Sequence, residues 1–477
     1  MESIWSLEPK LLNHPDGCTQ GHAEFDADRF IRLSIPLGQL LGEDGELSTS
    51  FSLDGDFGAD AVFGLSQDGY YQTLIDVHGL KLGFSAPGFC AQSLCGTQLY
   101  VSRKIIEPNP RIARFVLEMA GLREWVGQSP FIECFTPKEG GGFWKRYSLS
   151  YSDEDVPEVI LLDSSGIKIT LEHRWTVKGG ALPTARFIHS CESDYDLVLS
   201  FNSPISLDKA FFEWAMPIRS FLCFCMGMRS IVRNMHFTTS EGVTADYYVP
   251  LVDGEEPSDD ELRQMPISWS NYSGKIPRML EQWLALEDQA KEAAKRAVSL
   301  LERKNVSIDT FFLANAQAFE AITRVGVEQK ELSQEEYNRR IACVEHSGLE
   351  PKIIKWIKRK MKHANSISAN ELAEQRIKML GEYGKYVVPD TESYLQEHRD
   401  TRNYYTHLDA NGKSHILSEG IDAIINADAT YMLLYGSVCQ LLGFEPDELL
   451  AAVKFSRFKW SSVDRSRKRY RLEKSES

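Results

Sequence analysis

The sequence predicts an α+β protein of two domains, with a β-rich sheet or sandwich in residues 1–270 and an all-α helical bundle in residues 271–477. Three observations predict this division. Short runs of alternating apolar and polar residues, separated by Gly and Asp-Gly turns, fill the first half. From Pro277 onward, apolar residues recur instead at the spacing of helices. Residues 1–270 carry 21 Lys and Arg against 38 Asp and Glu, whereas residues 271–477 carry 32 against 30, so the excess acidity ends with the strands.

The first domain is expected to form a sandwich or a barrel-like sheet, because short strands recur along it. Strands are expected at residues 30–35, 62–65, 70–77, 80–84, 114–118, 131–135, 159–162, 167–175, 197–201, 231–238 and 245–251. A helix at residues 207–228, with Ser206 as N-cap and a kink at Pro217, interrupts them. An acidic turn then leads to a domain boundary between about residues 265 and 277.

The second domain is expected to be a bundle of amphipathic helices with short connections. Helices are expected at residues 279–294, 308–325, 335–345, 351–361, 371–380 and 419–442, with one more that begins at Arg402. The basic tail at residues 465–471 is expected to be a disordered end or to bind an acidic partner.

The composition argues against several classes of protein. The nine cysteines form no CxxC pair and no Cys/His set at zinc spacing, so we expect reduced thiols, a cytoplasmic location and no metal or cofactor. The N-terminus lacks the pattern of a signal peptide, and charges and Pro217 break the most apolar run, so no membrane span is expected. With no overall basic excess, any contact with nucleic acid must be local.

The stretch that most suggests chemistry is residues 399–407, with the sequence RDTRNYYTH. Thr401 is expected to be an N-cap, so that a helix begins at Arg402 and places Asn403 and His407 one turn apart on one face. Such an arrangement suits a phosphate. A guanidinium is a fixed fork of donors, a helix N-terminus favours negative charge, and an imidazole moves protons near neutral pH.

The spacing of Arg402 and His407 alone carries little information, because roughly 0.6 such pairs are expected by chance in this composition. The whole string RNYYTH, in helical surroundings, resembles the R-N-x-x-x-H motif of HEPN domains. It resembles most the ApeA-type HEPN proteins of bacterial anti-phage defence. The resemblance covers about residues 308–443, and the β-rich region is similar to the ApeA N-terminal domain.

This resemblance implies a metal-independent endoribonuclease that acts in abortive infection. The ribose 2′-OH would attack the adjacent phosphate, leaving a 2′,3′-cyclic phosphate and a 5′-OH. His407 would move a proton, and Arg402 would stabilise the charge that develops on the phosphate. The resemblance also implies a homodimer or higher homo-oligomer, an RNA substrate with tRNA as one candidate, a phage-derived trigger, and an N-terminal domain that senses or regulates.

Four neighbours of the pair are candidates for supporting roles, namely Asn403, Tyr404, Asp400 and Arg399. Asn403 would orient His407 or hold the helix start. Tyr404 and its neighbour Tyr405 would either stack on bases or pack in the core. Arg399 and Asp400 would either assist or form a solvated approach to the helix.

A basic run at residues 352–363 is a second candidate for contact with RNA. Its candidate residues are Lys355, Lys358, Arg359 and Lys362. The run would either guide a phosphate backbone or form the solvated face of an amphipathic helix. The alternative function for the whole chain is a non-catalytic module, in which the bundle binds nucleotide or a protein partner and the β domain recognises a ligand. The intact pair of Arg402 and His407 favours the nuclease.

Overall fold

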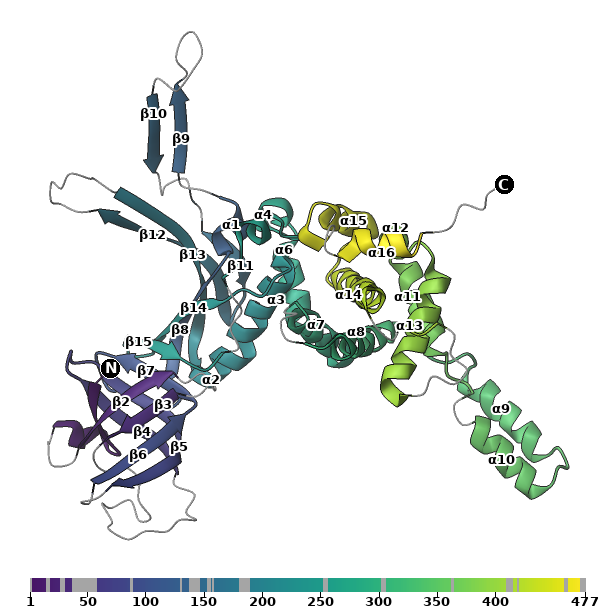
Figure 1. The fold of residues 1–477 in the computed structure, drawn as a ribbon, viewed down its shortest axis with the longest axis horizontal. Coiled ribbons are helices and arrows are strands. Elements are labelled where there is room, and N and C mark those ends of the chain that lie inside the picture. The colour runs from purple at the N-terminus through teal and green to yellow at the C-terminus, as the bar shows by residue number, and fades with distance from the viewer. Residues whose placement is uncertain are drawn as a thin grey trace. The chain divides into compact units, whose positions relative to one another are not determined.

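The computed structural model divides into two compact units, residues 1–219 with 230–258 and residues 220–229 with 259–477 (Figure 1). It describes residues 2–13, 18–25, 31–36, 58–85, 89–128, 131–136, 146–151, 156, 158–179, 189–251, 256–301, 306–361, 364–408, 415–417, 420–458 and 462–471. The first unit is β-rich and the second is helical, so the predicted fold class is confirmed. The sequence placed the change of domain at 270/271, and the division of contacts falls at 258/259.

The first unit contains a large sheet, whose strands do not follow one another in sequence order, and a separate two-stranded hairpin. Its strands are β1 (Glu2–Ser6), β2 (Thr19–Phe25), β3 (Ile31–Ile35), β4 (Gly58–Ser66), β5 (Tyr71–Ser85), β6 (Phe89–Gly96), β7 (Gln98–Ser102), β8 (Arg111–Met119), β9 (Phe131–Thr136), β10 (Arg146–Tyr151), β11 (Val159–Asp163), β12 (Ile167–Gly179), β13 (His189–Ser206), β14 (Val232–Thr239) and β15 (Thr244–Tyr248). The order in the sheet is β11-β12-β13-β8-β14-β15-β7-β5-β4-β1-β2-β3-β6, and β9 pairs with β10. A short 3₁₀ helix, η1 (Pro9–Asn13), lies between β1 and β2, and α1 (Leu122–Val126) lies between β8 and β9.

One end of the sheet closes into a barrel because β5 pairs with β4 and β7 through its first half and with β6 through its second. The sequence predicted two strands here, at 70–77 and 80–84, and this is wrong, because the backbone continues through the junction. Asp76 takes a left-handed φ of 54° at the change of partner, and a bulge follows between Gly79 and Lys81. Gly96 permits the close approach at the barrel rim, since a Cβ there would lie 2.6 Å from the Leu74 side chain.

The barrel interior is filled by side chains that alternate along its strands. Ile31, Leu33 and Ile35 of β3 are buried, while the residues between them are half-buried. Trp5 of β1 is completely buried among Val62, Leu74 and Leu94. The barrel is therefore a packed core, and the barrel-like alternative of the sequence prediction is the one that the structure adopts.

A helical segment follows β13, and its first part packs against the sheet. It consists of α2 (Leu207–Lys209), a π-helical turn η3 (Ala210–Ala215) and α3 (Met216–Met226). Ser206 caps it as predicted, with its hydroxyl accepting from the Lys209 N–H. The π turn ends two residues before Pro217, which lacks an N–H to continue the regular ladder. Phe211 packs against Phe115 of β8 and Tyr247 of β15.

The second unit is a bundle of helices. They are α4 (Asp259–Arg263), α5 (Trp269–Tyr272), α6 (Ile276–Leu284), α7 (Asp288–Ser299), α8 (Ile308–Thr323), α9 (Gln334–Glu345), α10 (Pro351–Met361), α11 (Ala369–Met379), α12 (Gly381–Val387), α13 (Thr391–His407), α14 (Ile421–Leu441), α15 (Pro446–Lys454) and α16 (Asp464–Arg469). The helix expected at 279–294 is divided into α6 and α7, which meet where Asp288 has a left-handed φ of 43°.

Helix α14 is the centre of this bundle, because nearly its whole circumference is buried. It packs against α7, α8, α12, α13, α15 and α16. Helix α16 replaces the disordered tail that the sequence predicted. Arg465 pairs with the buried Asp428 of α14, and Arg469 pairs with Glu397 of α13. The basic tail is therefore ordered by acidic partners within its own unit.

Candidate functional site

The helix that carries the RNYYTH string is longer than predicted, and the string lies at its C-terminal end instead of at its start. Helix α13 begins at Thr391, where Asp390 caps it by accepting from the Ser393 N–H. The predicted N-cap, Thr401, lies inside the helix, is fully buried, and accepts from the Leu417 N–H through its hydroxyl. Arg402 and His407 therefore lie in its last turns, which end at Leu408 in a left-handed conformation. The C-terminal end of a helix disfavours an anion, so the predicted help from this helix dipole is wrong.

Arg402 is held by a carboxylate from another helix. Its Nη2 lies 2.8 Å from Oε2 of Glu320 on α8, and its Nη1 donates to Oδ1 of Asn403 at 3.4 Å. The other oxygen of Glu320 lies 2.6 Å from Nη2 of Arg324. Glu320 thus joins two arginines, and its own side chain is 28 % exposed. The Arg402 side chain as a whole is 38 % exposed, and Arg402 lines the pocket described next.

A pocket of about 250 Å³ lies beside this ion pair, between α8, α11 and α13. Helix α8 contributes Glu320 and Thr323 to its wall, and α13 contributes Arg399, Arg402 and Asn403. The start of α11 contributes Ser368, Ala369 and Asn370.

The start of α11 supplies the helix N-terminus that the sequence placed on α13. Ser368 and Glu371 form a capping box there, which fixes the first turn of the helix at the pocket wall. The positive end of the α11 dipole and two arginines of α13 therefore face one cavity, an arrangement suited to a phosphate.

His398 also lines the pocket, one helical turn before Arg402. Its ring lies 3.2 Å from Oδ1 of Asn426 and packs on the rings of Tyr394 and Phe312. Burial, followed by the positive charge of Arg402, lowers the pKa of His398 to about 4, against the opposing effect of the Asn426 hydrogen bond. The imidazole is therefore neutral at physiological pH, and it contributes shape and hydrogen bonds rather than charge.

This half-buried histidine makes the stability of the protein depend on pH. The folded state keeps the ring neutral down to about pH 4, whereas the unfolded chain takes up a proton below about pH 6.5. The unfolded state then binds more protons at this residue, so the contribution of His398 to the free energy of unfolding should fall by up to about 3 kcal/mol as pH drops through this window. In urea unfolding curves, His398→Gln should show a shallower fall than the wild type. Equal slopes would contradict a half-buried neutral histidine.

His407 is exposed in the last turn of α13 and is not among the residues that line the pocket. It lies five residues after Arg402, which is about 140° around a helix axis. Asn403, four residues before it, shares its face and does reach the pocket. One copy of the chain therefore brings Arg402 and Asn403 to the pocket, with His407 one turn beyond its edge.

The supporting candidates have structural partners. Asp400 is buried between Arg399, whose Nε lies 3.1 Å away, and His415 at 3.5 Å, so a solvated approach is wrong for this residue. Asn403 cannot hold a helix start, because the helix starts twelve residues earlier. Tyr404 is half-buried and its ring lies 5.6 Å from that of Tyr405. Tyr405 packs on Phe312 and donates to the Leu417 carbonyl, which is core packing.

The basic candidates lie elsewhere in the unit. Lys355, Lys358 and Arg359 belong to α10, which contributes nothing to the pocket wall, and Lys362 lies outside the described residues. In the described parts of the chain, no three His, Cys, Asp or Glu side chains gather as metal ligands do. None of the helices described is long and apolar enough to cross a membrane.

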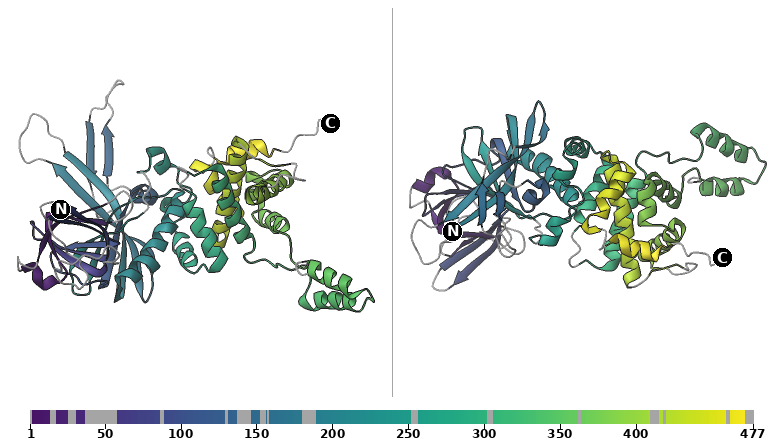
Figure 2. Two further views of the ribbon diagram at one scale, coloured as in Figure 1. Left: turned by 60° about the horizontal axis from the view of Figure 1, so that its bottom comes forward. Right: turned by 90° about the horizontal axis from the view of Figure 1, so that it is seen from above.

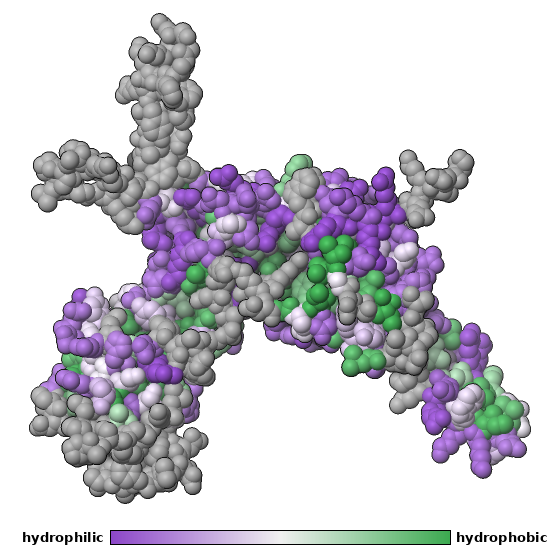
Figure 3. All heavy atoms as spheres, viewed as in Figure 1, coloured by the Kyte–Doolittle hydropathy of each residue, from purple (hydrophilic) through white to green (hydrophobic). Residues whose placement is uncertain are grey.

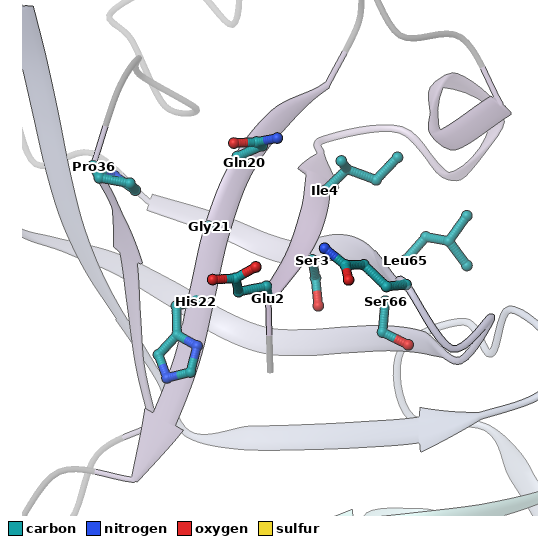
Figure 4. A pocket seen from close by; sticks show the side chains of 10 residues that line it. Glu2, Ser3, Ile4, Gln20, Gly21, His22, Pro36, Leu65 and Ser66 are labelled. Carbon is teal, nitrogen blue, oxygen red and sulfur yellow. The ribbon is translucent and has the colours of Figure 1, made fainter.

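A second pocket, of about 340 Å³, opens on the barrel of the first unit (Figure 4). Strands β1, β2 and β4 supply its wall, where Glu2 and His22 are register partners and Gln20, Ile4 and Leu65 lie nearby. The lining mixes charged, amide and apolar groups.

Comparison with family models places these features in a known class. Residues 313–448, which contain the pocket and the RNYYTH string, match the Apea-like HEPN model, so the helical unit is a HEPN domain. Residues 9–283, more than half of the chain, match ApeA N-terminal domain 1. The chain therefore belongs to the ApeA-like HEPN proteins. No curated protein and no solved structure matches it.

Proposed function

We propose that this protein is a metal-independent HEPN endoribonuclease and the effector of an anti-phage abortive-infection system. The observation that carries the proposal is the partly exposed side chain of Arg402 at a pocket that is also lined by the N-terminus of α11. Both features stabilise negative charge, and both lie within the region that matches the HEPN family. The β-rich domain, with its barrel pocket, is proposed to sense the trigger or to regulate the nuclease.

The chemistry follows from the two side chains of the motif. A ribose 2′-OH loses its proton to His407 and attacks the adjacent phosphorus, and the bond from phosphorus to the 5′-oxygen breaks. The 5′-oxygen leaves with a proton, and the products are a 2′,3′-cyclic phosphate and a 5′-OH. Arg402 stabilises the phosphate oxygens as their charge increases. An approaching phosphate competes with Glu320 for this guanidinium, so substrate binding rearranges the ion pair.

A homodimer is part of the proposal. In-line displacement needs a base and an acid, and one motif holds one histidine. His407 is exposed and stands outside the pocket wall of its own chain. Two motifs that face each other across a twofold axis would bring both imidazoles to the substrate. We propose RNA as this substrate, with tRNA as one candidate.

The decisive experiment incubates the full-length protein with total cellular RNA in EDTA and maps the cut ends. The proposal predicts cleavage that survives the chelator, with 2′,3′-cyclic phosphate and 5′-OH termini. Loss of cleavage in EDTA, with recovery on adding Mg²⁺ or Mn²⁺, would reject this mechanism.

The same experiment tests the alternative of a non-catalytic binding module. One observation favours that alternative, because Arg402 is paired with Glu320 and His407 lies away from the pocket in a single chain. A binding module would retain nucleotide or RNA without cutting it. Intact RNA after incubation with a protein that binds RNA would support this reading.

A further inference from the structure

The segment that joins α8 to α11, and that contains the α9–α10 hairpin, begins and ends at the candidate pocket. The chain leaves α8 at Thr323, a pocket residue, and re-enters the pocket wall at Ser368, the N-cap of α11. Backbone hydrogen bonds close the base of this segment, from the Ile367 N–H to the Gln329 carbonyl and from the Glu331 N–H to the Asn365 carbonyl. The base therefore directly precedes Ser368 of the pocket wall.

The two helices of the hairpin form a small layer of their own. They lie side by side in both views of Figure 2 and contact each other. The Tyr337 hydroxyl of α9 donates to the Met361 carbonyl at the end of α10, and Lys358 pairs with Glu345 across the two helices. Neither helix has a fully buried residue. Nearly all of the outer surface of the hairpin is therefore available to a partner.

The exposed face of α10 carries a row of positive charge beside an aromatic ring. Lys352, Lys355 and Arg359 are all exposed and follow one another at three- and four-residue spacing, so they form one row along the helix. Trp356 is 54 % exposed and lies four residues after Lys352, on the adjoining face. Apolar side chains on the hairpin are also visible in Figure 3. The row spans about 10 Å of helix, enough to contact neighbouring phosphates of one strand.

We propose that the α9–α10 hairpin is an RNA-binding arm, in which Lys352, Lys355 and Arg359 hold backbone phosphates and Trp356 stacks on a base of the strand that enters the pocket. This inference rests on the proposed function in taking RNA as the ligand. Lys358 contributes less than the sequence suggested, because Glu345 already neutralises it.

RNA fits this surface better than a membrane or a protein does. Helix α10 contains five Lys and Arg and no acidic residue, in a domain whose net charge is close to neutral. A single exposed tryptophan beside a cationic row suits base stacking with phosphate contact, the combination that single-strand binders use. The segment that carries the hairpin begins and ends at the pocket. RNA bound to the hairpin would therefore be guided toward the pocket.

The test measures binding of a fluorescent single-stranded RNA to full-length protein in a His407→Ala background, so that the RNA stays intact. A triple variant, Lys352→Ala with Lys355→Ala and Arg359→Ala, should bind roughly tenfold more weakly at low salt. Its slope of log affinity against log salt should shrink by about 2, since each lost phosphate contact removes about 0.7. Trp356→Ala should weaken binding without changing the slope, because stacking releases no counterions.

A matched control removes three lysines from other helices of the same unit, namely Lys295→Ala, Lys378→Ala and Lys385→Ala. Its net charge change equals that of the triple variant, and its affinity and slope should stay at the wild-type values. Equal losses in the control, or no loss in the triple variant and Trp356→Ala, would overturn the proposal. The proposal would also be overturned if the wild type binds anionic lipid vesicles and the triple variant loses this binding while its affinity for RNA is unchanged. RNA binding that depends on the hairpin in a protein that cuts no RNA would support the arm and reject the nuclease.

Discussion

Replacing His407 with alanine is expected to lower the rate of RNA cleavage by about 10²–10⁴-fold, because the reaction loses the group that transfers a proton. The same change should leave the thermal unfolding temperature near that of the wild type. His407 is exposed at the end of α13, so its removal opens no cavity in the core. Cleavage is measured in EDTA at equal concentrations of folded protein, and stability by thermal melting monitored through circular dichroism.

The control is His78→Ala, which removes another exposed imidazole from the β-rich unit. It should retain wild-type cleavage and wild-type protection of bacteria against phage, whereas His407→Ala loses both at a normal level of soluble protein. A His407→Ala variant that still cuts RNA and still protects would show that the RNYYTH string is structural. The binding module would then take the place of the nuclease.

The sequence predicted where helices and strands lie along the chain better than it predicted which of them pair or pack together. Residues 351–361 form the expected helix to the residue, and the alternation in β3 matches the buried face of a strand. These features depend on local patterns of apolar residues. The closure of the barrel depends on the pairing of β5 with β6 and on a left-handed Asp76, which no periodic pattern signals.

The start of α13 shows why a local signal misled. Thr401 is a good N-cap by residue type, and Asp390 is an equally good one eleven residues earlier. Residues 391–407 contain neither Gly nor Pro, so nothing in the chain stops a helix that begins at Thr391. Burial of Thr401 against the segment at Leu417 is a tertiary contact, and it decides between the two caps.

The site residues that the sequence did not indicate also divide into those fixed by local helix spacing and those fixed by tertiary packing. His398 precedes Arg402 by four residues, so the correct helix start would have placed it on the same face. Glu320 is 82 residues from Arg402, and the start of α11 is in yet another segment. Only the packing of α8, α11 and α13 brings these groups to one pocket.

Replacing Arg402 with alanine is expected to lower cleavage by about 10²–10³-fold, because the charge on the phosphate oxygens loses its donor fork. Arg402→Lys should remain strongly impaired, since an ammonium keeps the charge but cannot donate two parallel hydrogen bonds. The ion pair with Glu320 is partly exposed, and such pairs contribute about 0.2–1 kcal/mol, so the protein should stay folded.

Arg324 provides the matched control for this residue. It pairs with the other oxygen of Glu320 at 2.6 Å, yet it is not part of the pocket wall. Arg324→Ala therefore removes a similar ion pair from the same carboxylate without removing a group from the pocket. Cleavage by this variant should stay within a few-fold of the wild type, with a similar small change in melting temperature. Equal losses of activity in Arg324→Ala and Arg402→Ala would show that both arginines stabilise α8 and that neither acts on the phosphate. The phosphate site would then have to lie elsewhere on the HEPN domain.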